Sequence, residues 1–119
     1  IGVDSDQAPI IDAYGEGMTV TSAMKGLAPT VNTLLSAIVL DDTWSDYVGK
    51  IDNLGLVSDN VEENYVQLPL ESTQWNDGFT EDDYKALVAD MVAGKVTVDN
   101  SIDAMPETAI TVNDLGNIK

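Results

Sequence analysis

The acidic residues that follow the first apolar segment stand at the position in this chain best suited to binding chemistry. Asp4, Ser5 and Asp6 come directly after Ile1-Gly2-Val3, which has the pattern of the end of a buried strand. In open α/β sheets, ligands bind beyond the carboxyl ends of the strands. A carboxylate at this position can accept hydrogen bonds from hydroxyl groups of a ligand. The spacing of the two acids is common, however, and does not by itself identify a ligand.

Lys25 is the cation with the most informative position. The chain has five lysines and no arginine, and Lys25 lies between an expected strand and an expected helix. Gly26 follows it and allows another part of the backbone to approach closely. Lys25 therefore either faces a ligand cleft or neutralises nearby acids such as Asp4 or Asp6, and spacing alone favours neutralisation.

Other kinds of site have weaker support. A twelve-residue calcium loop needs an oxygen ligand and a glycine where Ala8 and Pro9 stand. Close pairs of carboxylates arise by chance among 21 acids in 119 residues. The chain has no glycine-rich phosphate loop. Four aromatic side chains could stack on a ring-shaped ligand, although such residues more often close the edge of a core; they are Trp44, Tyr47, Trp75 and Phe79. We expect no metal ion and no cofactor.

Composition restricts the class of protein further. A chain of 119 residues that is 44% hydrophobic is long enough for one domain with a core and too short for two. Its formal charge of -16 repels nucleic acid at long range. Without Cys and His, zinc sites of the usual kind, thiolate nucleophiles and histidine-based triads are excluded. An enzyme would depend on carboxylates and lysine alone, so we expect a non-catalytic protein.

Hydrophobic periodicity predicts strands interleaved with helices, and thus an α/β fold. Alternation predicts a strand over 18–23, with Met18, Val20 and Ser22 on its buried face. Helical spacing of apolar residues predicts helices over 27–41 and 80–93, the second beginning at Thr80 as N-cap. The short apolar runs 54–57 and 65–68 indicate a hairpin or a long exposed loop. The remainder, 100–119, is expected to be a polar tail with weak strand character over 108–112.

Four separate motifs, in order, resemble one protein family. They are Ile1-Gly2-Val3-Asp4-Ser5-Asp6-Gln7, Thr19-Val20-Thr21-Ser22-Ala23-Met24-Lys25-Gly26, Asn53-Leu54-Gly55-Leu56 and Val92-Ala93-Gly94-Lys95-Val96. The chain resembles the C-terminal part of the basic membrane protein family of substrate-binding lipoproteins, which includes purine nucleoside receptors of ABC transporters. The resemblance covers residues 1–99, and the tail 100–119 has no counterpart in it.

This resemblance implies a type I periplasmic-binding fold, in which two hinged α/β lobes close on a ligand and this chain contributes strands and helices to both. It implies a non-catalytic component of an ABC importer that captures a nucleoside, and the expected ligand is a purine nucleoside. In the family, the acid of the Gly-Val-Asp strand end accepts hydrogen bonds from ribose hydroxyls, and the lysine of the Lys-Gly motif reaches the nucleoside. These roles fall on Asp4 and Lys25, with Asp6 as the reserve candidate for the sugar.

The resemblance also implies partners and a location. The whole protein would be a bacterial lipoprotein, anchored outside the cytoplasm by a lipid on a region that this chain lacks, and would deliver its ligand to an ABC permease. Separated from the rest of such a protein, the helix over 27–41 would expose an apolar face. We therefore expect self-association through Val31, Leu34, Leu35 and Ile38. The alternative is an acidic structural or adhesion domain of the cell surface, stabilised by calcium.

Overall fold

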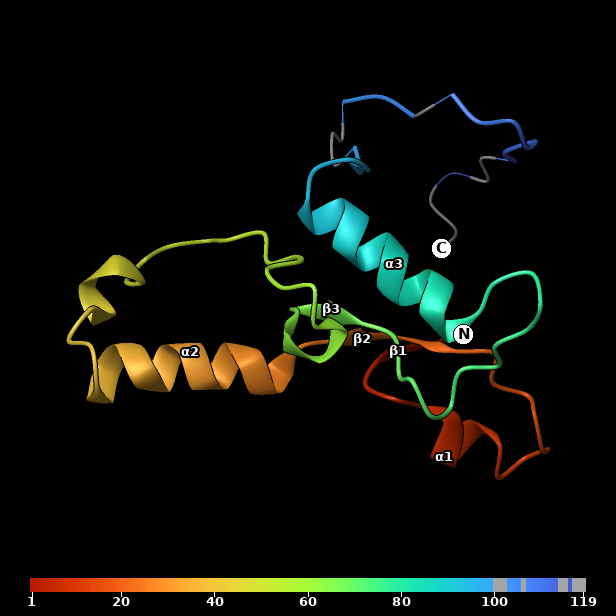
Figure 1. Ribbon diagram of the computed structural model, residues 1–119, viewed down its shortest axis with the longest axis horizontal. Coiled ribbons are helices and arrows are strands. Elements are labelled where there is room, and N and C mark those ends of the chain that lie inside the picture. Colours follow the sequence, from red (N-terminus) through yellow and green to blue (C-terminus); the bar gives the residue numbers. More distant parts are fainter. Residues whose placement is uncertain (100–102, 106, 114–115, 117–119) are drawn as a thin grey trace.

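Three short strands form a mixed sheet at the centre of the molecule in the computed structural model, which describes residues 1–99, 103–105, 107–113 and 116 (Figure 1). Strand β1 (Gly2–Asp4) pairs in parallel with β2 (Ser22–Lys25), and β2 pairs antiparallel with β3 (Val66–Gln67). The order in the sheet is β1-β2-β3. The chain is thus a small mixed α/β domain, as the interleaved periodicities predict.

The two long helices begin and end close to the predicted positions. Helix α2 (Leu27–Val39) starts one residue after Gly26, and Pro29 lies in its first turn, where a missing N–H costs nothing. Helix α3 (Glu81–Val92) starts with a capping box: the Thr80 hydroxyl accepts from the Asp83 N–H, and the Asp83 carboxylate accepts from the Thr80 N–H. Three shorter elements complete the fold: α1 (Ala8–Ile11) and the 3-10 turns η1 (Trp44–Asp46) and η2 (Val61–Glu63).

The core is small and lies beneath α3. It consists of Val61, Tyr84 and Val88, with partly buried apolar neighbours packed around them; these are Leu56, Leu68, Leu70 and Trp75. The Trp75 and Tyr84 rings stack with centroids 5.7 Å apart, and the Tyr84 hydroxyl accepts a hydrogen bond from the backbone N–H of Leu68. These contacts join the C-terminal helix to the segment that carries β3.

The strand predicted over 18–23 begins late, and of the three residues predicted for its buried face only Ser22 is buried. β2 starts at Ser22, Met18 and Val20 are exposed, and Thr19 is buried. The physical reason is that side chains bind this backbone in place of a neighbouring strand. The Asp12 carboxylate accepts from the Thr19 N–H at 2.9 Å, and the Gln74 amide donates to the Thr19 carbonyl at 2.8 Å.

Of the two alternatives for 54–68, the long loop is correct. Residues 54–57 form no strand, and β3 at 66–67 pairs with β2 instead. The described tail residues 107–113 also form no strand. The remaining tail positions of that prediction, 100–102, 106, 114–115 and 117–119, lie outside the described residues.

Helix α2 projects from the sheet as an arm (Figure 1). The molecule is extended: its radius of gyration is 17.6 Å, against about 13.5 Å for a compact domain of this length. Val31, Leu35 and Ile38 are exposed as predicted, whereas Leu34, beside them at the edge of this face, is half-buried and lines a cavity. In the part of the chain that the structure describes, no helix has the length and apolar character needed to cross a bilayer.

Candidate functional site

Parallel pairing of β1 and β2 brings Asp4 and Lys25 to the same edge of the sheet. Asp4 is in register with Met24, so Lys25 follows one residue beyond it. The Lys25 ammonium lies 2.7 Å from the Asp4 carboxylate, and the two side chains are 67% and 62% exposed. The contact agrees with the neutralising role considered for Lys25, and its partner is Asp4 and not Asp6. Both groups also remain open to a ligand from solvent.

The backbone of Asp4 has an uncommon conformation. Its φ angle is +76°, in the left-handed region that costs most non-glycine residues free energy and that Asp and Asn tolerate best. Such a conformation persists only where the surrounding structure imposes it, and it occurs often at functional sites. Here the strand ends, and the chain turns away from β2 toward α1.

Gly26 is required by the close approach of two backbones beside Lys25. Its N–H donates to the Tyr65 carbonyl at 2.7 Å. A Cβ at this position would lie 2.2 Å from the Asn64 carbonyl oxygen and 2.7 Å from the Tyr65 Cα. No side chain fits there without moving backbone, so Gly26 fixes both the end of β2 and the start of α2. The Lys-Gly pair thereby positions the lysine at the sheet edge.

A cavity of about 240 Å³ lies beside the Asp4–Lys25 pair. The strand ends, the first turn of α2 and two polar residues form its wall; the lining residues are Asp4, Ser5, Met24, Lys25, Gly26, Leu27, Ala28, Pro29, Glu62 and Gln67. The N-terminus of α2 has no side-chain cap and no acid in its first turn, so its free N–H groups retain their positive partial charge. The site combines carboxylate acceptors with ammonium and amide donors.

Asp6 has a different role from Asp4 in the structure. One oxygen of its carboxylate accepts from the Ala8 N–H at 3.0 Å and from the Ser22 hydroxyl at 3.4 Å. The other accepts from the Ser72 hydroxyl at 2.7 Å. Asp6 therefore connects the loop after β1 with the start of β2 and with Ser72 in the loop after β3. It does not line the cavity beside Asp4. Its carboxylate is already used within the fold.

Glu62 and Gln67 are site residues that the sequence motifs do not indicate. Gln67 reaches the cavity because β3 pairs with β2, with Met24 opposite Gln67. Its amide donates to the carbonyls of Glu62 and Asn64 at 2.7 and 2.8 Å, which fixes the side chain at the cavity wall. Gln67 belongs to a two-residue strand and Glu62 to a three-residue 3-10 turn. Elements this short have no periodic signal from which the sequence could place their side chains.

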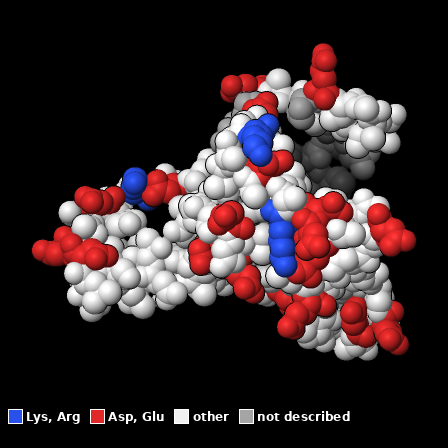
Figure 2. Space-filling model, in the orientation of Figure 1, with Lys and Arg blue, Asp and Glu red and all other residues white. Residues whose placement is uncertain are grey.

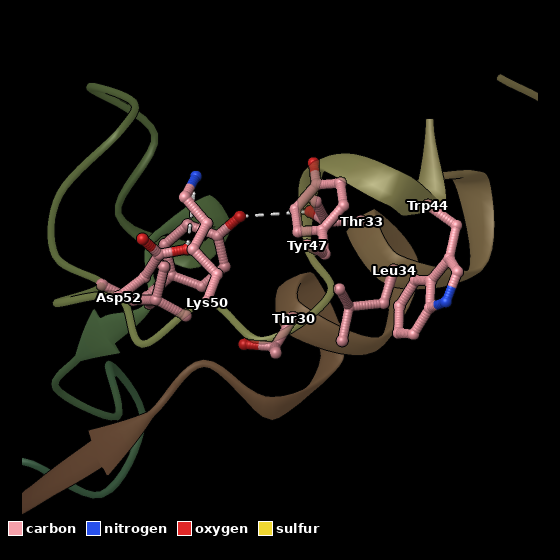
Figure 3. A pocket seen from close by; sticks show the side chains of 9 residues that line it. Thr30, Thr33, Leu34, Trp44, Tyr47, Lys50 and Asp52 are labelled. Carbon is pink, nitrogen blue, oxygen red and sulfur yellow. Dashed lines mark hydrogen bonds and ion pairs between the residues drawn. The ribbon is translucent and has the colours of Figure 1, made fainter. Parts of the chain in front are cut away.

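A second cavity, of about 260 Å³, lies between α2 and the segment that carries η1 (Figure 3). Trp44 and Tyr47 stack on each other there with centroids 6.4 Å apart, and the Tyr65 and Thr33 hydroxyls share a hydrogen bond of 3.1 Å. The Lys50 ammonium lies 3.6 Å from the Asp52 carboxylate at the edge. The other two aromatic candidates, Trp75 and Phe79, pack with each other beside the core.

Among the described residues, no group of three or more acidic side chains converges in a way that could hold a metal ion. Acidic side chains are scattered over the visible face (Figure 2). Comparison with known proteins gives no match to a family model, a curated protein or a solved structure. The geometry of the site and the sequence motifs are therefore the basis for a functional proposal.

Proposed function

We propose that this chain is the C-terminal, ligand-contacting part of a solute-binding component of an ABC importer that captures a purine nucleoside without chemistry. Asp4 accepts hydrogen bonds from the vicinal 2′- and 3′-hydroxyls of the ribose, and Lys25 donates to acceptors of the nucleoside. The observation that carries the proposal is the Asp4–Lys25 pair at the carboxyl ends of parallel strands, beside a cavity. The motifs that contain both residues supply the ligand class.

Stability alone does not explain this arrangement. An ion pair between side chains as exposed as these contributes about 0–1 kcal/mol to the free energy of unfolding. The left-handed backbone of Asp4 costs a similar amount, about 1 kcal/mol. The net contribution of the pair to folding is thus close to zero. A role in binding accounts for a strained, charged and exposed residue better than a structural role does.

The chemical groups of the site match those of a nucleoside. An ionised carboxylate accepts from both hydroxyls of a vicinal diol, and an ammonium group offers three donors to ring or sugar acceptors. The uncapped N-terminus of α2 adds backbone donors on the same side of the cavity. A neutral ligand of this kind is also not repelled by a chain of charge -16.

The wider setting follows from the same proposal. The whole protein is a two-lobed lipoprotein that is held at the outer face of a bacterial membrane by a lipid and passes its ligand to an ABC permease. In this setting the α/β domain described here supplies one part of a hinged cleft.

The proposal is tested by nuclear magnetic resonance of the isotope-labelled chain during titration with adenosine and with 2′,3′-dideoxyadenosine, which lacks the vicinal 2′- and 3′-hydroxyls. Adenosine should shift the resonances of Asp4, Lys25 and Gly26, and the analogue should leave them nearly unchanged. Equal shifts with both compounds, or shifts confined to other residues, would contradict recognition of the ribose.

Thermal unfolding with and without calcium separates this proposal from an acidic structural domain. The nucleoside proposal expects the same melting temperature in calcium and in a sodium salt of equal ionic strength. A marked rise in calcium alone, together with no response to adenosine, would favour the structural domain.

A further inference from the structure

Helix α2 has one covered side and one uncovered side. The covered side packs toward the cavity between α2 and the η1 segment and carries Thr30, Thr33, Leu34 and the buried Ala37 (Figure 3). The other side, here called the free face of α2, consists of Leu27, Val31, Leu35, Ile38 and Val39. Val31, Leu35 and Ile38 are each 53% exposed, and Leu27 and Val39 more so. Their spacing of three and four residues gives a continuous apolar strip along the helix.

The free face is a part of this acidic chain that carries no charge of its own. No residue between Lys25 and Asp41 carries a charge, although the chain as a whole carries -16. In Figure 2 the visible surface over α2 is white along most of its length, and acidic side chains gather beyond its C-terminal end. Two copies that meet along this strip keep most of their acids apart.

The two ends of α2 lack partners of the kind that helix ends attract. The N-terminal end has no side-chain cap and no acid in its first turn, and the C-terminal end has no basic residue in its last turn. Asp41 and Asp42 follow the C-terminal end, where the helix dipole is already negative. Antiparallel pairing of two α2 helices places these acids beside the positive N-terminal end of the other copy.

We propose that two copies of this chain pair through the free face of α2, with the two helices antiparallel. The same strip on both copies makes the contact self-complementary, as a two-fold dimer requires. A helix of 13 residues is about 20 Å long, so the pair buries less than the roughly 800 Å² per partner of a standard interface. The dimer is therefore weak, with a Kd between about 10 µM and 1 mM.

Sedimentation velocity of the full chain over a range of concentrations tests the proposal. The unmodified chain should shift from monomer to dimer, and Leu35→Glu should remain monomeric because pairing would bury its charge. Thr97→Glu adds the same charge to an exposed position outside α2 and should dimerise within about 3-fold of the unmodified chain. Circular dichroism verifies that each variant keeps its helices. A monomer at every concentration, or equal dimerisation of Leu35→Glu, would overturn the proposal.

A second experiment tests the antiparallel orientation of the two α2 helices and distinguishes it from unspecific association of apolar surfaces. Replacing both Asp41 and Asp42 with Asn lowers the repulsion between copies, so unspecific association would become tighter. Antiparallel pairing predicts the opposite, a dimer weakened about 3- to 10-fold, because two attractions to helix N-termini are lost. Asn also tolerates the left-handed backbone of Asp42, whose φ is +50°. Unchanged or tighter association of this double variant would refute the antiparallel arrangement.

Discussion

The Asp4 carboxylate and the Lys25 ammonium form an ion pair of 2.7 Å although a helix and a long connection separate them in the sequence. The pair exists because β1 and β2 are parallel neighbours whose carboxyl ends meet at one edge of the sheet. Gly26 then turns the chain into α2 under the backbone of Asn64 and Tyr65. The same local geometry that ends β2 therefore also positions the lysine.

The left-handed backbone of Asp4 predicts different effects for two substitutions. Asp4→Asn should change the free energy of unfolding by less than about 1 kcal/mol, because the ion pair is exposed and Asn tolerates a positive φ. Asp4→Ala should be less stable than Asp4→Asn by about 1 kcal/mol, the cost of a left-handed conformation for alanine. Urea denaturation of both variants measures the difference. Equal stabilities would show that the backbone at Asp4 is not constrained.

The hydrogen bonds of Asp6 predict that this residue stabilises the fold. Asp6→Ala leaves the Ala8 N–H and the Ser72 and Ser22 hydroxyls without their acceptor, and should lower the free energy of unfolding by about 2–3 kcal/mol. Ser72→Ala removes one of these bonds and should cost about 1 kcal/mol. Asp46→Ala, at the exposed turn η1, is the matched control and should change stability little. If Asp6→Ala is as stable as this control, the proposed role of Asp6 is wrong.

The buried side chain of Asn64 predicts a large loss of stability on truncation. Its carbonyl oxygen accepts from the N–H groups of Val57 and Ser58 at 2.6 and 2.9 Å, and its amide donates to the Ser58 carbonyl at 2.9 Å. Asn64→Ala leaves these part-buried backbone groups without their partners and should lower the free energy of unfolding by about 2–4 kcal/mol. Denaturant titration measures this loss, with the exposed Asn32→Ala as the control. A loss below that of the control would show that the loop does not depend on Asn64.

The capping box of α3 predicts a pH dependence with a definite sign. Hydrogen bonds from the Thr80 hydroxyl and N–H lower the pKa of Asp83 below its usual value of 3.8. A lowered pKa means that the stabilisation is present above the pKa of the unfolded state and is lost as pH falls through the folded value. Asp83→Asn, which does not titrate, should melt at a lower temperature than the unmodified chain at neutral pH. The difference in melting temperature between the two proteins should become smaller below about pH 4. A difference that does not change with pH would contradict the role of the Asp83 carboxylate in the capping box.

Local signals in the sequence predict the helices well and the sheet only in part. Apolar spacing and the Thr80 cap are features of neighbouring residues, so α2 and α3 appear where they are expected. The start of β2 depends instead on the Asp12 and Gln74 side chains, which bind the backbone of Thr19 from remote positions. No short-range pattern contains that information.

In the candidate site, too, some residues could be predicted from local sequence patterns and others could not. Asp4 and Lys25 lie at strand ends that the motifs mark, and parallel pairing brings them together. Gln67 reaches the cavity because it lies in a two-residue strand that pairs antiparallel with β2. The Asp6 carboxylate accepts a hydrogen bond from the hydroxyl of Ser72, which is distant in the sequence. Both depend on tertiary contacts that only the folded chain reveals. The assignment of Asp6 as a reserve ligand residue stays a prediction, with its hydrogen bonds favouring a structural role.

The affinity of adenosine for the unmodified chain and for Asp4→Asn, measured by titration calorimetry beside the Asp46→Asn control, tests the central claim most directly. Loss of a charge-assisted acceptor, worth about 1.5–3 kcal/mol, should weaken binding about 10- to 150-fold in Asp4→Asn. The control removes the same charge far from the cavity and should bind like the unmodified chain. Equal affinity of Asp4→Asn and the control, or no adenosine binding by the unmodified chain, would contradict the proposed nucleoside site.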